Sequence, residues 1–182
     1  MAEAYVFLAD GFEEIEGLTV VDLLRRAGIE TQTVSVMKEK TIVGSHGIEL
    51  KADLTFDETD AATAQLFVLP GGMPGTKHLA AHEGLAVLLK EQAAAGKRIA
   101  AICAAPSVLG SLGLLDGKTA ACYPGFEGQL IGATVTANSV EISGNVTTSR
   151  GMGTAIPFGL ALVAQLRDQE TADQLAKSII YG

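Results

Sequence analysis

One cysteine stands out as a candidate nucleophile, in the stretch AAICAAPS at residues 100–107. Cys103 lies between small residues at the end of an apolar run, in the form of a nucleophile elbow with alanines in place of glycines. Pro106 suits the first turn of a following helix, whose dipole would favour the thiolate. The backbone N–H group of Ala104 could hold an oxyanion. The alternative is a buried structural cysteine, because free cysteine is among the most buried residue types.

The segment GFEEIE near the start of the chain contains three carboxylates. Glu13 and Glu14 are expected to complement the dipole at the N-terminus of a helix. Glu16 lies one turn into that helix, beside apolar neighbours. Desolvation there would raise the pKa of its carboxyl group and keep it protonated near neutral pH. Glu16 is therefore a candidate for exchanging a proton with a substrate.

A glycine-rich turn, PGGMPG at residues 70–75, follows a short apolar run. Glycine has no Cβ, so such a turn can bring the backbone close to a ligand. The N–H groups of Gly71 and Gly72 could complete an oxyanion site with that of Ala104. A simple turn between a strand and a helix explains the same residues equally well.

The remaining unusual residues have ordinary explanations. Cys122 lies within a strand pattern and is interpreted as core. His78 and His82 have the spacing of metal ligands on a helix, but no third ligand is in view, and we expect a solvated face and no metal. His46 could reach a site, although nothing local indicates it. The glycine-rich segment 149–154 could take an anion and is interpreted as a structural loop.

These residues are carried by a chain in which strands alternate with helices. Hydrophobic periodicity predicts helices after the first strand, over 76–95, after Cys103 and twice near the C-terminal end, and strands over 4–9, 30–36, 66–70, 98–102, 118–124, 139–143 and 145–149. A short β excursion is expected over 41–56. The pattern is typical of an α/β fold with a mostly parallel sheet covered on both faces. In such sheets ligands bind beyond the carboxyl ends of the strands, so 10–16, 70–75 and 103–107 should share one edge.

Composition limits the possible function classes. The 182 residues are 48% apolar and 19% charged, which predicts one globular domain over residues 1–182. A net charge of −8 without a local basic patch argues against nucleic-acid binding. Because no apolar run could span a bilayer and no signal peptide is recognisable, we expect no membrane association. Two cysteines without a CxxC motif favour a cytoplasmic location with reduced thiols.

Five segments together resemble the ThiJ/PfpI superfamily, in the branch of the Parkinson-disease protein deglycase. The likeness runs over nearly the whole chain and rests on GFEEIE, VDLLRRAGI (21–29), LPGG (69–72), AAICAAPSVL (100–109) and TSRGMGTA (148–155). It implies a flavodoxin-like three-layer α/β sandwich and a homodimer. It also implies that Cys103 is the reactive elbow cysteine and that Glu16 is a buried carboxyl hydrogen-bonded to its sulfur. Gly72 and Ala104 match residues that supply backbone N–H groups at the site.

Other positions match the family less closely or differ from it. Arg26 and His46 match positions near the dimer interface and the rim of the pocket. Tyr123 stands where the animal proteins of the branch have a histidine near the cysteine. Ala104 stands where the peptidase branch has a histidine. A cysteine protease needs an imidazole to take and return the proton, so the resemblance does not favour peptidase activity.

The leading hypothesis is a cofactor-independent cysteine enzyme that detoxifies 2-oxoaldehydes such as methylglyoxal, or their early adducts with proteins. Cys103 would form a hemithioacetal, Gly72 and Ala104 would hold the oxyanion, and Glu16 would shuttle a proton between two substrate carbons. The partner would then be a small-molecule aldehyde or a glycated adduct.

The same residues serve a second hypothesis, in which the chain is an oxidative-stress sensor or a redox-regulated chaperone that responds through oxidation of Cys103. An amidase or peptidase remains as a third and less favoured reading.

Overall fold

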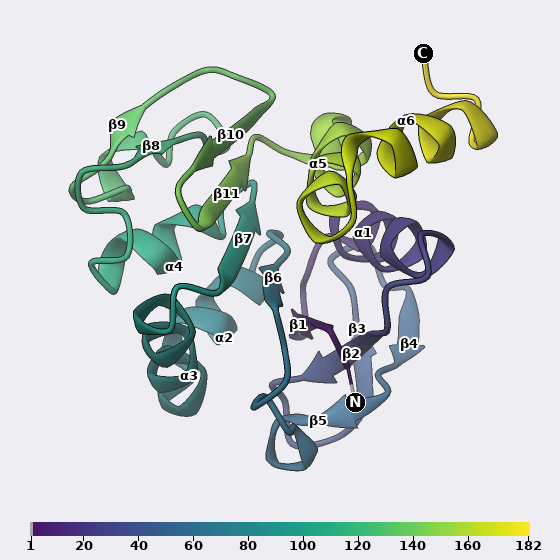
Figure 1. Cartoon of the computed structure of the whole chain (residues 1–182). Helices are drawn as coiled ribbons and strands as arrows, with labels where there is room; N and C mark the ends of the chain where they lie inside the picture. Colours follow the sequence, from purple (N-terminus) through teal and green to yellow (C-terminus); the bar gives the residue numbers. More distant parts are fainter. Residues whose placement is uncertain (1) are drawn as a thin grey trace.

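Seven strands form the central sheet in the order β10–β11–β7–β6–β1–β2–β5, in a computed structural model that describes residues 2–182. Neighbouring strands are parallel except β10 and β11, which form an antiparallel hairpin at one edge (Figure 1). The strands are β1 (Ala4–Leu8), β2 (Thr31–Ser35), β5 (Leu54–Thr55), β6 (Leu66–Leu69), β7 (Arg98–Ile102), β10 (Val140–Ser143) and β11 (Val146–Ser149). The predicted α/β class with a mostly parallel sheet is confirmed.

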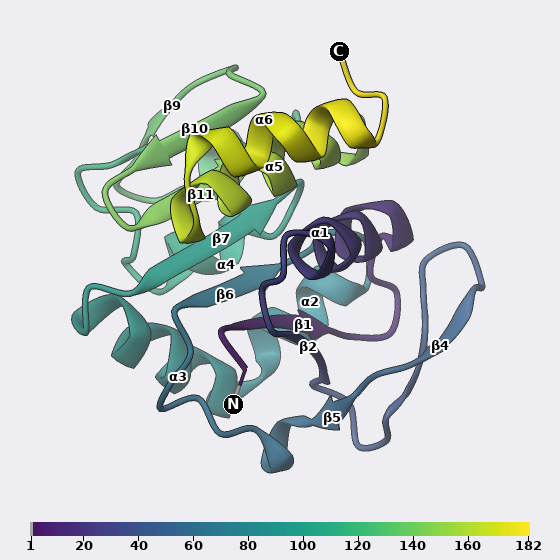
Figure 2. The same ribbon diagram turned by 45° about the vertical axis from the view of Figure 1, so that its right-hand side comes forward.

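Helices cover both faces of the sheet and make it the middle of three layers. Figure 1 and Figure 2 show α1, α5 and α6 on one face and α2, α3 and α4 on the other. The bounds are α1 (Glu14–Arg26), α2 (Gly75–Ala81), α3 (Glu83–Ala94), α4 (Pro106–Ser111), α5 (Ala155–Leu166) and α6 (Gln169–Ser178). Acidic residues in the first turn of α1 and arginines in its last turn complement the helix dipole, as the sequence predicts.

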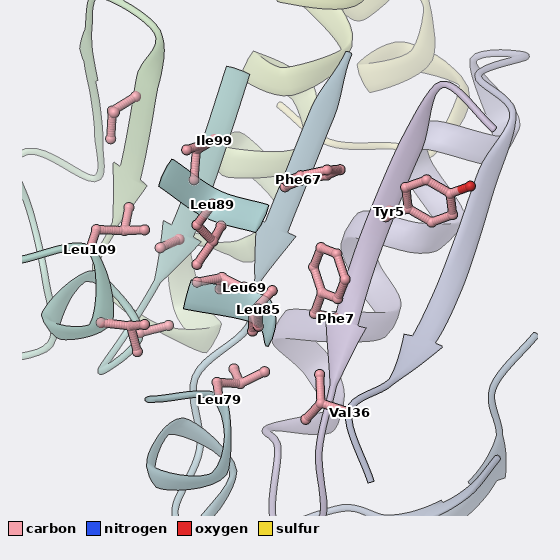
Figure 3. Close-up of a cluster of buried hydrophobic side chains, with 14 of the residues drawn as sticks. Tyr5, Phe7, Val36, Phe67, Leu69, Leu79, Leu85, Leu89, Ile99 and Leu109 are labelled. Carbon is pink, nitrogen blue, oxygen red and sulfur yellow. The ribbon is translucent and has the colours of Figure 1, made fainter. Parts of the chain in front are cut away.

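Strand β1 divides its side chains between two apolar cores, because successive residues of a strand point to opposite faces. Tyr5 and Phe7 face the core under α3 and α4, while the other three residues of β1 face α1 and α5. Figure 3 shows Phe7 beside Phe67, with ring centroids 5.3 Å apart in an edge-to-face arrangement. Complete burial of one such side chain contributes about 1.5–3 kcal/mol to folding.

The helix expected over 76–95 is two helices. The chain breaks at His82, which has extended backbone angles between α2 and α3. Its Nδ1 atom accepts the N–H group of Leu85 at 3.0 Å and so caps α3. A side-chain acceptor at this position satisfies an N–H group that a continuous helix would bond internally, which favours the break. His78 and His82 therefore do not share one helix face.

Short strands lie outside the main sheet. β3 (Thr41–Val43) and β4 (Glu49–Lys51) form an antiparallel hairpin, and together with β5 they account for the expected β excursion (Figure 1). β8 (Thr119–Ala120) pairs with β9 (Thr134–Val135), so the strand expected over 118–124 is shorter than predicted and belongs to a separate two-stranded sheet. Single turns of 3₁₀ helix occur at Phe56–Glu58, Glu127–Gln129 and Met152–Thr154.

Strands β7, β6 and β1 are adjacent and parallel, which decides where the candidate residues lie. The loops that follow these strands leave the sheet at the same edge, side by side. Within residues 2–182, no helix combines the length and the apolar character needed to cross a bilayer.

Candidate active site

Glu16 and Cys103 flank the backbone of Gly71. The N–H group of Gly71 donates to Glu16 Oε2 at 2.9 Å. A Cβ atom on Gly71 would lie 2.6 Å from Cys103 Cβ and 2.8 Å from Glu16 Oε2, so only glycine fits between them. The Glu16 carboxyl and the Cys103 thiol lie close enough for each to change the pKa of the other. Three segments that are distant in sequence thus bring one carboxyl and one thiol together.

Cys103 has a strained backbone. Its φ of 65° lies in the left-handed region, which costs a residue with a side chain on the order of 1–3 kcal/mol. Two hydrogen bonds hold it there: Cys103 N–H donates to the carbonyl of Ser149 at 3.0 Å, and Tyr123 N–H donates to the carbonyl of Cys103 at 2.8 Å. The side chain is half-buried. This is the sharp strand-to-helix turn that the elbow pattern predicts.

Two backbone N–H groups face the sulfur of Cys103, those of Gly72 and Ala104. Gly72 has a φ of +89°, and a Cβ atom there would collide with the backbone of Glu13, so this turn requires glycine. The N–H group of Gly71 bonds to Glu16 and is not open to a substrate, contrary to the expectation that both glycines could serve. The site therefore offers two donors to a negative charge formed beside the sulfur.

The two side chains shift each other's protonation. Glu16 is 1% exposed, and burial raises the pKa of its carboxyl group to about 7. For Cys103, burial and then the charge and hydrogen bond of Glu16 raise the pKa of the thiol to about 12, although the N–H groups of Gly72 and Ala104 oppose the rise. Near neutral pH the thiol of Cys103 therefore keeps its proton, while the carboxyl group of Glu16 is present in both its protonated and its ionised forms.

The preformed thiolate expected from the helix dipole is therefore not what this geometry favours. Helix α4, which follows Cys103, has only six residues, so its dipole is small. Burial beside a carboxylate outweighs the small dipole.

The DJ-1/PfpI family model matches residues 2–165, which is most of the chain. The chain belongs to the DJ-1/PfpI family. The solved structure of oxidized Toxoplasma gondii DJ-1 superposes with a TM-score of 0.96 at 36% identity and covers 100% of both chains. This likeness confirms the flavodoxin-like fold.

The chain is also similar in sequence to two other DJ-1/PfpI proteins. Protein DJ-1 homolog A of Arabidopsis thaliana is 37% identical over 176 residues, which are 95% of this chain and 45% of that protein. The chain thus spans less than half the length of this relative. Deglycase PH1704 of Pyrococcus horikoshii is 33% identical over 144 residues, which are 78% of this chain and 86% of that protein.

His46 lies outside the Cys103 pair in this DJ-1/PfpI chain and contacts the carboxylate of Glu14. Its Nδ1 atom is 2.9 Å from Glu14 Oε2, and its backbone N–H donates to Glu14 Oε1 at 2.8 Å. Burial would raise the pKa of Glu14, but the hydrogen bonds from His46 and Ser45 lower it to about 2. The bond to Glu14 in turn raises the pKa of exposed His46.

The sequence analysis missed this pair, since it assigned Glu14 to the helix dipole. The residue in the sequence that reflects this pair is Gly44. A Cβ atom at this position would collide with the Glu14 carboxylate, so the contact requires glycine. Donor atoms of Glu13, Glu14 and His46 lie within 4.8 Å of one another, but the hydrogen bonds among them already account for this arrangement. Arg26 lies elsewhere on α1 and pairs with Asp22 at 2.6 Å.

The segment 149–154, interpreted as a structural loop, contributes directly to the DJ-1/PfpI site. Its first residue, Ser149, accepts the N–H group of Cys103. A Cβ atom on Gly151 would lie 3.3 Å from Tyr123 Cδ2 and 3.9 Å from Glu16 Oε1. No local pattern indicates these contacts, because they depend on β11 pairing with β7. Cys122 is 3% exposed, within the core as predicted.

Proposed function

We propose that this chain is a cofactor-independent enzyme that converts 2-oxoaldehydes such as methylglyoxal into 2-hydroxy acids. One observation carries the proposal: the carboxyl of Glu16, with a pKa of about 7, interacts with the thiol of Cys103 beside two N–H donors. A nucleophile, an acid–base group near neutral pKa and donors for a developing oxyanion are the parts that this conversion needs.

The conversion uses these groups in sequence. The sulfur of Cys103 attacks the aldehyde carbon while its proton passes to Glu16, and the N–H groups of Gly72 and Ala104 hold the oxyanion. Glu16 returns the proton to the oxyanion, which completes a hemithioacetal. The Glu16 carboxylate then removes the proton from the former aldehyde carbon, which leaves an enediolate. It delivers this proton to the adjacent carbon, while the hydroxyl proton passes from the first oxygen to the second. The product is a thioester of a 2-hydroxy acid, and water hydrolyses it to restore the thiol.

The same chemistry extends to early adducts of 2-oxoaldehydes with proteins. The relative named a deglycase supports this extension. An adduct that releases or presents a 2-oxoaldehyde would enter the same sequence at the attack of Cys103.

Lactate production is the direct test of the proposal. The protein, incubated with methylglyoxal and EDTA but without glutathione or a nicotinamide cofactor, is expected to form one lactate for each methylglyoxal consumed. An enzymatic lactate assay measures the yield, with heat-denatured protein as the control. Lactate formation no faster than in this control would contradict the proposal.

A second candidate function is oxidation sensing, which the difference between the two cysteines favours. Cys103 is half-buried beside N–H donors, whereas Cys122 is buried. Hydrogen peroxide would oxidise the Cys103 sulfur to a sulfenic acid with release of water, and a second peroxide would give the sulfinic acid. A protonated Glu16 could donate a hydrogen bond to that sulfinate. The match to an oxidized DJ-1 structure is compatible with this role.

Mass spectrometry after mild peroxide treatment tests the second candidate. A gain of two oxygen atoms at Cys103, with Cys122 unmodified, is expected because only the first sulfur is accessible. If this oxidation occurs and no lactate forms from methylglyoxal, sensing is the favoured function. Equal oxidation of the two cysteines would contradict a sensing role.

Peptidase activity gains no support from His46 or His82. His46 is paired with Glu14, and His82 caps α3 and contacts Phe56 in a tilted arrangement with ring centroids 4.3 Å apart. Neither serves as the imidazole base that a cysteine peptidase requires.

A further inference from the structure

An open hollow of about 410 Å³ lies beside the Cys103 pair and has no role in the reaction described above. Its lining residues are Tyr123, Pro124, Arg150, Gly151, Met152, Gly153 and Thr154. Volumes of roughly 300–1,000 Å³ are typical of pockets that bind drug-sized molecules. Methylglyoxal, which carries only a methyl group beside its ketone, would leave such a hollow almost empty.

The walls of the hollow are mainly apolar. Tyr123 is 51% exposed and Met152 is 56% exposed, so a ring face and a thioether are open to an incoming group. Pro124 adds a further apolar surface, and Gly151 and Gly153 add no side chains. Such walls suit a planar apolar group, because aromatic rings and methionine sulfur attract other rings beyond simple burial.

The hollow adjoins the reacting atoms across Gly151. A Cβ atom there would lie 3.3 Å from the Tyr123 ring and 3.9 Å from Glu16 Oε1, so little more than a methyl group separates ring and carboxyl. Tyr123 is also tied to the nucleophile, since its N–H group donates to the carbonyl of Cys103. A substrate with one carbon at the sulfur and the next at Glu16 would extend its substituent over Gly151.

We propose that the hollow is a substituent-binding subsite, with Tyr123 and Met152 as specificity-determining residues, and that it selects 2-oxoaldehydes carrying an aromatic group. This inference rests on the proposed function and names its substrate class. Phenylglyoxal is the simplest such compound, and its product by the same sequence is mandelate.

Substrate preference tests the subsite. The wild-type protein is expected to have a higher kcat/KM for phenylglyoxal than for methylglyoxal. Tyr123→Ala is expected to lower that ratio roughly tenfold, as loss of an aromatic contact predicts, and Met152→Ala to lower it less. Tyr123→Phe, which keeps the ring, should retain the ratio. Val87→Ala is the matched control, because Val87 is 57% exposed on α3, outside the hollow.

A ratio that Tyr123→Ala changes by less than twofold would overturn the subsite while leaving the proposed function standing. Product binding tests the subsite even where the proposed function fails, because it needs no turnover. By isothermal titration calorimetry, mandelate is expected to bind the wild type at least fivefold more tightly than lactate, and Tyr123→Ala should remove the difference. If neither aldehyde is consumed, the proposed function fails, and equal affinities for mandelate and lactate would then overturn the subsite as well.

Discussion

Cys103→Ser is expected to lower the rate of lactate formation from methylglyoxal on the order of 10⁴-fold or more, to near the rate without enzyme, as loss of a nucleophile does in other covalent enzymes. A serine hydroxyl is a far weaker nucleophile than a thiol at the same pH. Glu16 with a pKa of about 7 is too weak a base to activate it. The measurement is single-turnover and steady-state lactate formation at pH 7.5.

The structure offers a matched control for this change. Cys122→Ser alters the other cysteine of the chain, which lies in the core and takes no part in the reaction. It is expected to retain activity and to lose stability, because a buried hydroxyl group costs free energy unless it finds a hydrogen-bond partner. Equal lactate rates for the wild type and Cys103→Ser would refute the covalent scheme. Circular dichroism melting shows whether the Cys103 variant remains folded.

Glu16→Gln is expected to lower kcat roughly 10²–10⁴-fold, the range typical of a lost general acid–base group. The amide oxygen can still accept the N–H group of Gly71, so the loop after β6 keeps its position. In the wild type, activity is expected to rise with pH through about 7, because the carboxylate form would accept the thiol proton. The variant is expected to lose that ascending limb. A rate loss with the limb unchanged would show that another group is the base.

Glu16→Gln is expected to slow the reaction but to stabilise the folded protein. The pKa of Glu16 is raised by burial, so the protonated form favours the folded state, and stability falls as pH rises from about 4.5 to about 7. Glu16→Gln removes this dependence and is expected to increase the free energy of unfolding at pH 8 by up to about 3 kcal/mol. Urea denaturation at pH 5 and pH 8 measures it. A variant less stable than the wild type at pH 8 would contradict the assigned pKa direction.

The opposing results distinguish a catalytic role for Glu16 from a structural one. If Glu16 served only the stability of the fold, its replacement would not make the protein more stable while it slows the reaction. A buried carboxyl and a cysteine with a positive φ both destabilise the fold. Such unfavourable groups are typical of active sites, where the chemistry needs them.

The sequence by itself determined the elements that carry the site. Alternating strand and helix patterns, with acidic residues at the start of α1 and Gly28 after its end, predict the α/β class from local propensity. The small residues around Cys103 and Pro106 likewise predict a sharp turn after β7, because such a turn needs small neighbours and a residue that can begin a helix.

The tertiary structure decided what those residues do to one another. The bond between Gly71 and Glu16 joins positions 55 residues apart, and no periodicity encodes it. The raised pKa values of Glu16 and Cys103 follow from burial against each other, which a local pattern cannot report. Gly151 reaches Tyr123 and Glu16 only because β11 pairs with β7. Neighbouring residues determine the local conformation, whereas proximity, desolvation and the pKa shifts that follow arise only when distant segments pack together.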